Sequence, residues 1–216
     1  MARVSQAHLD ARRRQILDGA SLCFARNGFH ATSMQDVLKE VDLSAGAVYR
    51  YFSGKDELIG AIVAEVLEAV HDTYERAAQE TPPPLPDVLI TRALAQLRAL
   101  KPGVLDGGEW IFPRLMIQVW TETLRNDELS AVMRTGYDQV RAAWAKLVES
   151  YKAADLMPAD ADADAMARTM IALAQGFAAQ QAVFGAASPE VLRDGLRALM
   201  SMRTGGSGGM NGSQLG

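Results

Sequence analysis

Apolar residues recur at helical spacing along almost the whole chain, and this periodicity is the feature that most limits the possible folds. Between residues 8 and 27, for example, Ile16, Ala20, Cys23 and Phe24 fall on one helical face. No stretch combines alternating apolar and polar residues with many β-branched side chains, as a half-buried strand would. The sequence therefore predicts an all-α protein.

Turn and helix-stop residues divide this pattern into separate helices. Gly28 follows the first helix, where a left-handed residue commonly ends a helix. The prolines at 82–84 and 86 end a long helix that begins near Asp56. Further helices are expected through residue 100 and over 109–124, 127–154, 160–184 and 188–202, with a loop at 101–108. Residues 204–216 are rich in glycine and serine, and we expect a disordered tail there.

Residues 33–52 combine a short helix, a tight turn and a second short helix, which is the helix-turn-helix arrangement. Thr32 and Gln35 have the spacing of a capping box at the first helix, and Ser44 is a good N-cap for the second. In DNA-binding proteins of this type the second helix enters the major groove. Gly46 within that helix costs about 1 kcal/mol relative to alanine, which suggests a close approach of DNA. An ordinary helical hairpin is the alternative interpretation.

Charge is distributed unevenly, although the whole chain carries a net charge of −4. Residues 1–55 hold eight Lys and Arg against five Asp and Glu, whereas the remaining residues hold 14 against 21. A basic segment on an acidic body concentrates positive potential at one end, as DNA binding requires. An excess of this modest size could also arise by chance.

Several residues between Arg14 and Leu58 stand at fixed spacings. They include Phe24, Gly28 and the motif L-S-x-G-x-x-Y-x-Y-F-x-x-K-x-x-L, which runs from Leu43 to Leu58. With these residues, the segment closely resembles the N-terminal DNA-binding module of the TetR family of repressors. The resemblance implies a DNA-binding domain of three helices over residues 1–55. A helical ligand-binding and dimerisation domain would follow over 56–203, with residues 56–80 as the connecting helix.

The resemblance also implies roles for the matching residues. Thr32 and Ser33 match residues that bind a phosphate at a helix N-terminus. Tyr49 and Lys55 match residues that contact the DNA backbone. The side chains expected to face the groove are those of Ser44, Ala45, Ala47 and Arg50, while Gly46 leaves room for close approach. Arg50 could pair with a guanine or contact a phosphate, and the sequence leaves both possibilities open.

Aromatic residues and methionines are frequent in the second half of the chain. Such side chains suit an adaptable apolar pocket between helices, although they could simply fill a core. The resemblance favours a pocket, because members of the family bind ligands in this region. The expected lining residues are Trp110, Met116, Trp120, Tyr137, Met170 and Phe177, with polar contacts from Gln118, Glu122 and Gln175.

The last two expected helices, at about 160–202, have the composition of a self-association surface. The first is rich in alanine, and the second carries an apolar stripe of Val191, Leu192, Leu196 and Leu199. A symmetric dimer needs a self-complementary patch of this kind. The resemblance implies a four-helix bundle formed by two copies, and packing within one chain is the alternative.

Together these features predict a homodimeric repressor that binds double-stranded operator DNA and is released by a small apolar or amphipathic ligand. Two alternatives remain: a regulator of this type without a small-molecule effector, and a helical enzyme or scaffold that retained the DNA-binding head. No catalytic, cofactor or metal motif is apparent, so we expect no enzymatic activity, no cofactor and no metal. The chain has no apolar run of 18 residues, and its one cysteine fits a reducing cytoplasm.

Overall fold

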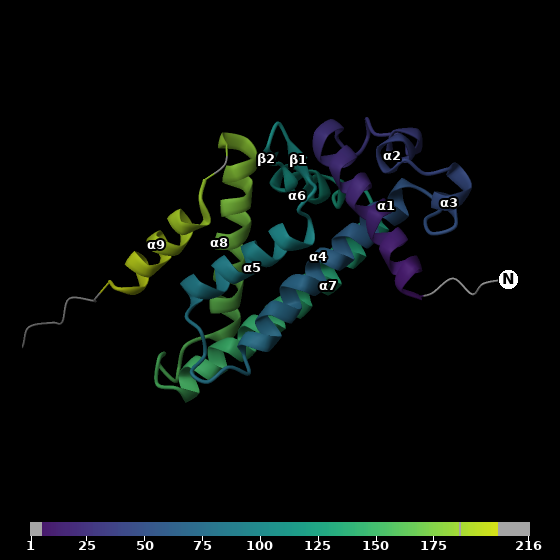
Figure 1. Ribbon diagram of the computed structural model, residues 1–216. Helices are drawn as coiled ribbons and strands as arrows, with labels where there is room; N and C mark the ends of the chain where they lie inside the picture. The colour runs from purple at the N-terminus through teal and green to yellow at the C-terminus, as the bar shows by residue number, and fades with distance from the viewer. Residues whose placement is uncertain (1–5, 186, 203–216) are drawn as a thin grey trace, which may run out of the picture.

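The computed structural model describes residues 6–185 and 187–202, and most of this part of the chain is helical (Figure 1). The all-α expectation is therefore confirmed, while the expected tail at 204–216 lies outside the described residues. The helices are α1 (Gln6–Asn27), α2 (Met34–Val41), α3 (Ala45–Tyr49), α4 (Lys55–Ala77), α5 (Pro86–Leu100), α6 (Phe112–Glu122), α7 (Asp127–Ala153), α8 (Ala163–Phe184) and α9 (Pro189–Met200).

Two long helices, α4 and α7, lie side by side along the molecule (Figure 1). They run in the same direction, since Asn126 bonds to Asp56 near one end and Ser150 bonds to the carbonyl of Ala78 near the other. Gly136 allows their close approach, because a Cβ atom there would collide with the side chain of Leu67. The pair α4 and α7 forms the frame on which the other helices are placed.

The remaining helices pack around this frame. Helix α5 contacts α4, α8 contacts α7, and α6 contacts both α8 and α1. Helix α9 rests against α5, where Leu196 is its buried residue. Helices α1, α2 and α3 form a head at one end of the molecule, and α4 begins at Lys55 (Figure 1).

Two apolar cores fill the molecule. The first joins the head to the neighbouring part of the body, since Phe24 and Val48 belong to the same cluster as Leu115 and Val119 of α6. The second lies farther along the body and includes Trp144, which is fully buried. The head therefore shares its hydrophobic core with α6. A movement of α6 would displace side chains that pack against α1.

The N-terminus of α2 differs from the expected capping box of Thr32 and Gln35. Ser33 is the N-cap: its hydroxyl accepts a bond from the Asp36 backbone, and the Asp36 carboxylate accepts one from the Ser33 backbone at 2.8 Å. Thr32 is buried instead, and its hydroxyl lies 2.7 Å from the carbonyl of Gly28. Threonine therefore closes the end of α1, and the box starts one residue later.

A short antiparallel hairpin replaces the loop expected at residues 101–108. Its strands are β1 (Leu105–Asp106) and β2 (Glu109–Trp110), with Leu105 opposite Trp110. Gly107 and Gly108 connect them with φ values of 55° and 86°, which a two-residue turn of this kind needs. Because residues 109 and 110 pair as a strand, α6 begins at Phe112 and not near residue 109.

Candidate functional site

Helix α3 is short and exposed, as the sequence predicts for the second helix of a helix-turn-helix. The Ser44 hydroxyl caps it by accepting a bond from the Ala47 backbone at 3.3 Å. Val48 is 0% exposed and Phe52 only 2%, so these residues fix the helix to the head. The opposite face consists of small and polar side chains and of two larger ones, Tyr49 and Arg50, both exposed.

Two residues of this outer face are not explained by packing within the chain. Tyr49 is 50% exposed although it is a large aromatic residue. At Gly46, an added Cβ atom would meet no other atom within 4 Å. The fold does not require an aromatic side chain at the first position or glycine at the second, so contact with a partner is the better explanation for both.

The N-terminus of α2 already holds a negative group, the Asp36 carboxylate. Hydrogen bonds from the hydroxyl and the backbone N–H of Ser33 lower the pKa of Asp36, so this carboxylate is charged at neutral pH. A DNA phosphate at this helix end would compete with Asp36 for those donors. Thr32 cannot serve as a phosphate ligand as expected, because its hydroxyl is buried against the end of α1.

Lys55 joins the start of α4 to the turn between α1 and α2. Its ammonium donates to the Phe29 carbonyl at 2.9 Å and lies 4.8 Å from the centre of the Phe29 ring. A lysine ammonium has three N–H groups, so two remain after this bond. Lys55 is thus held in place with donors to spare for an anion.

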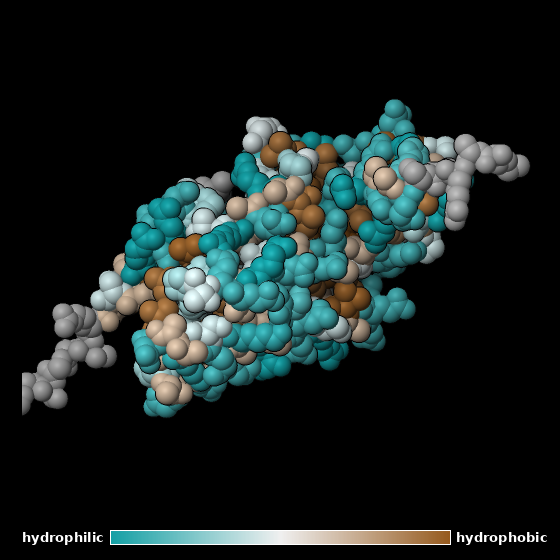
Figure 2. All heavy atoms as spheres, turned by 60° about the horizontal axis from the view of Figure 1, so that its bottom comes forward, coloured by the Kyte–Doolittle hydropathy of each residue, from teal (hydrophilic) through white to brown (hydrophobic). Residues whose placement is uncertain are grey.

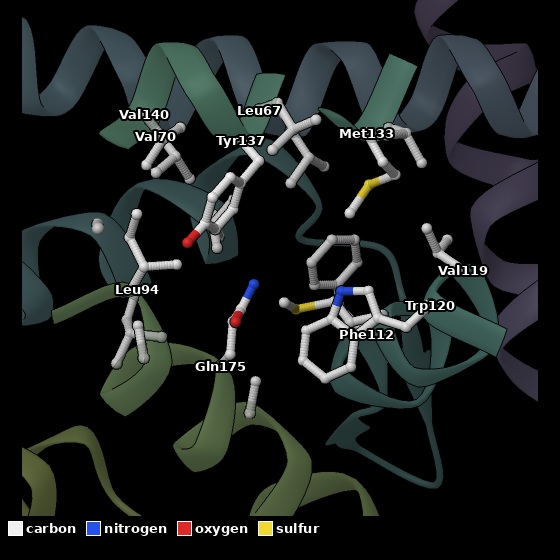
Figure 3. A pocket seen from close by; sticks show the side chains of 18 of the residues that line it. Leu67, Val70, Leu94, Phe112, Val119, Trp120, Met133, Tyr137, Val140 and Gln175 are labelled. Atoms are coloured by element: carbon white, nitrogen blue, oxygen red, sulfur yellow. The ribbon is translucent and has the colours of Figure 1, made fainter. Parts of the chain in front are cut away.

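A cavity of about 150 Å³ lies in the body between α4, α5, α6, α7 and α8 (Figure 3). Most of its wall consists of aliphatic and aromatic side chains, including Leu67, Leu94 and Phe112. Gln175 of α8 and Tyr137 of α7 bring polar groups to it, as does Trp120 of α6. No residue of the described wall carries a charged side chain.

The junction between head and body contains an ion cluster around a buried lysine. Lys101 follows α5 and is 0% exposed, with its ammonium 3.0 Å from the Asp18 carboxylate and 2.6 Å from that of Glu65. Asp18 belongs to α1 and Glu65 to α4. One lysine of the body therefore holds the first helix of the head against the connecting helix.

Family models match both parts of the chain. Residues 16–62 match the model described as bacterial regulatory proteins of the tetR family. Residues 91–202, more than half of the chain, match the model of the BetI-type transcriptional repressor C-terminal domain. The chain belongs to the TetR family. This TetR-family chain is accordingly a DNA-binding transcriptional regulator by class and not an enzyme.

Curated relatives agree with this assignment. The HTH-type transcriptional repressor Rv1474c of Mycobacterium tuberculosis is 35% identical over 127 residues, which cover 59% of this chain and 58% of that protein. The regulator YfiR of Bacillus subtilis is 26% identical over 150 residues, or 68% of each chain. The match therefore spans less than two thirds of the first relative and just over two thirds of the second.

Solved structures share the fold of this TetR-family chain. GusR of Salmonella enterica superposes with a TM-score of 0.68 at 23% identity, covering 93% of this chain and all of GusR. FadR of Bacillus halodurans gives a TM-score of 0.71 at 13% identity, over 88% and 94% of the two chains. The arrangement of a head on a helical body is thus the fold of the family.

Four of the nine residues expected to contact a ligand do line the cavity: Met116, Trp120, Tyr137 and Gln175. The other five lie elsewhere, and helix geometry explains why. Met116 and Trp120 are four residues apart on the face of α6 that is turned to the cavity. Gln118, which lies between them, and Glu122, two residues after Trp120, occupy the opposite face.

That opposite face of α6 contacts the head. The Gln118 side chain accepts a bond from the Phe29 backbone at 2.8 Å, and the Glu122 carboxylate lies 3.0 Å from the ring nitrogen of His30. These two residues are not ligand contacts in this structure. They link one wall of the cavity to the turn between α1 and α2.

Trp110, Met170 and Phe177 also lie outside the cavity wall. Trp110 belongs to β2, where its indole N–H donates to the Lys101 carbonyl at 3.0 Å and its ring stacks on Phe112. Met170 and Phe177 are buried on a face of α8 that is turned away from Gln175. Their apolar character reflects packing within the body.

Sequence reasoning missed the contribution of α4 and α5 to the cavity. Leu67 and Val70 stand at helical spacing with other apolar residues of α4, and the sequence does not distinguish such wall residues from ordinary core residues. The described residues contain no helix long and apolar enough to cross a membrane. They also contain no group of His, Cys, Asp or Glu side chains arranged to hold a metal ion.

Proposed function

We propose that this chain is a homodimeric repressor whose two copies of α3 bind successive major grooves of a palindromic operator. A small apolar or amphipathic molecule in the body cavity would release it. The observation that carries the proposal is the outer face of α3, where Gly46, Tyr49 and Arg50 are exposed on a helix fixed by Val48. A regulator that binds chromosomal DNA would act in the cytoplasm.

The surface formed by α8 and α9 supports the dimer. Phe184 is 83% exposed at the end of α8, and Val191 and Leu199 are 62% and 59% exposed on α9. Figure 2 shows hydrophobic residues at the surface near the end of the molecule where α9 lies. Apolar surface of this kind marks association sites, and a second copy of the same helices would cover it symmetrically.

Helix α6 supports the proposed release by ligand. One face contributes Met116 and Trp120 to the cavity, while the other holds the head through Gln118 and Glu122. A ligand that shifts α6 would therefore shift α1 and, in a dimer, change the distance between the two α3 helices. Coupling between two such sites is typically about 1–3 kcal/mol.

The proposal is tested by measuring the effect of ligand on operator affinity and the effect of operator on ligand affinity. Because coupling acts equally in both directions, a cavity ligand should weaken operator binding by the same factor by which operator weakens ligand binding, about 5–150-fold. The two affinities are measured by fluorescence anisotropy of labelled operator and by calorimetry. A ligand that binds in the cavity but leaves operator affinity unchanged would favour the alternative, a regulator without a small-molecule effector.

A further inference from the structure

The cavity has a chemical character that limits its ligand, and the inference below rests on the proposed function of the cavity as the effector site. We infer that the effector is an uncharged molecule about the size of a single substituted ring, whose polar group is recognised by Gln175 together with Tyr137 and Trp120. The volume of the cavity, the absence of charge on its described wall and the placement of these three side chains all point to such a ligand.

The volume of the cavity limits the size of the ligand that it can enclose. The cavity measures about 150 Å³, and a cavity of roughly 150 Å³ in a protein core is known to stay dry and to bind benzene. Figure 3 shows side chains of α4 and α7 along one side of this space, Gln175 of α8 on the opposite side, and Leu94 of α5 and Trp120 of α6 at its flanks. A ring with one small substituent would fill this space.

The absence of charged side chains on the described wall excludes ionic ligands. A buried ionic group needs a partner of opposite charge, because burial without one costs several kcal/mol. The described wall offers none. Glu122 lies on the other face of α6 and pairs with His30, and Arg168 on α8 is exposed and bonds to Asp164 at 2.7 Å.

Three polar groups reach the cavity and select for a ligand that can form hydrogen bonds. Figure 3 shows the Gln175 amide pointing into the space between Tyr137 and Trp120. Within the described residues, no protein group pairs with this amide. An unpaired amide supplies two donors and one acceptor, so it can bond to a hydroxyl, carbonyl or amide of a ligand.

Tyr137 adds a donor beside Gln175. Arg168 lies close to this hydroxyl: the pKa of Arg168 is raised mainly by Asp164 and, to a smaller extent, by Tyr137. Arg168 is already paired with the Asp164 carboxylate at 2.7 Å, and the Tyr137 hydroxyl can donate one hydrogen bond to a ligand. The Trp120 indole N–H is a third donor at the edge of the same space.

Four probes that share one ring test the inference on the purified full-length chain: benzyl alcohol, toluene, benzoate and benzylammonium. Binding is measured by calorimetry and by the change in tryptophan fluorescence. We expect benzyl alcohol to bind at least tenfold more tightly than either ion. In the variant Gln175→Leu, benzyl alcohol should lose about tenfold in affinity while toluene keeps or improves its own.

The matched control is Gln139→Leu, which makes the same change on the exposed face of α7 and should leave all four affinities unaltered. Retained toluene binding by Gln175→Leu shows that the variant is folded with its cavity intact. The inference is overturned if benzoate or benzylammonium binds more tightly than benzyl alcohol, if none of the probes binds, or if Gln175→Leu leaves the affinity for benzyl alcohol unchanged.

Operator binding is measured separately. The proposed release by ligand and the inference about the ligand's chemistry can then fail independently of one another. If benzyl alcohol binds as expected but does not weaken operator binding, the assignment of the cavity as a neutral-ligand site stands and its role in regulation fails. If an ionic probe releases the operator, regulation stands and the inference about charge fails.

Discussion

Replacing Asp18 by asparagine and Glu65 by glutamine is expected to lower the free energy of unfolding by about 3–5 kcal/mol. The substitutions keep the shape of both side chains but leave the ammonium of Lys101, which is 0% exposed, without a carboxylate partner. A buried charge that loses its partners destabilises a fold strongly. Urea denaturation followed by circular dichroism measures the change.

Adding Lys101→Met to this double variant provides the control. It removes the buried charge and fills the space with an apolar side chain, so most of the lost stability should return. If the double variant were as stable as the original chain, the cluster would not hold the head against α4. The linkage between head and body would then depend on the apolar core that α1 shares with α4 and α6.

The second large effect is expected at Gly46. The variant Gly46→Glu should reduce operator affinity by on the order of 100-fold, because its carboxylate would face the phosphates of DNA, and like charges in an interface cost several kcal/mol. The free protein should stay folded, since the space beyond Gly46 is open. Fluorescence anisotropy with labelled operator measures the affinity.

Two further variants separate charge from position. Ala142→Glu adds the same charge on the exposed face of α7 and should leave operator affinity within about twofold. Gly46→Ala adds only a methyl group, and it should weaken operator binding while stabilising α3 by up to about 1 kcal/mol. Unchanged operator affinity in Gly46→Glu would mean that α3 does not lie against DNA.

The helix-turn-helix of the head was predictable because its characteristic residues lie close together in the sequence at fixed spacings. Ser44, Gly46 and Tyr49 lie within six residues of one another, and helix geometry alone puts Val48 inside and its neighbours outside. Even here the ends of elements were misplaced. The sequence does not reveal that Thr32 turns back to the end of α1, so the capping box was assigned one residue too early.

The cavity was predictable only in part, because its wall is assembled from five helices that are distant in sequence. Aromatic and methionine content pointed to Trp120 and Tyr137, which line it, but equally to Trp110 and Phe177, which do not. The direction of a side chain depends on how its helix is rotated against its neighbours. Periodicity gives the buried face but not which neighbour that face meets.

The ion cluster at the junction gave no signal in the sequence. Lys101 stands in a segment that reads as an exposed loop, and its partners Asp18 and Glu65 are 83 and 36 residues away. Lysine is rarely buried, so composition argues against such a site. Its burial is a tertiary effect, because the partners of its ammonium come from α1 and α4.

Selection of bound sequences from a random pool of double-stranded DNA tests the central claim most directly. If two copies of α3 bind successive major grooves, the enriched sequences will form a near-palindrome with half-site centres about 34–36 Å apart, or a multiple of that distance. The same selection with Gly46→Glu should then enrich nothing. Enrichment of a single, asymmetric half-site, or of no sequence by the original chain, would contradict the account.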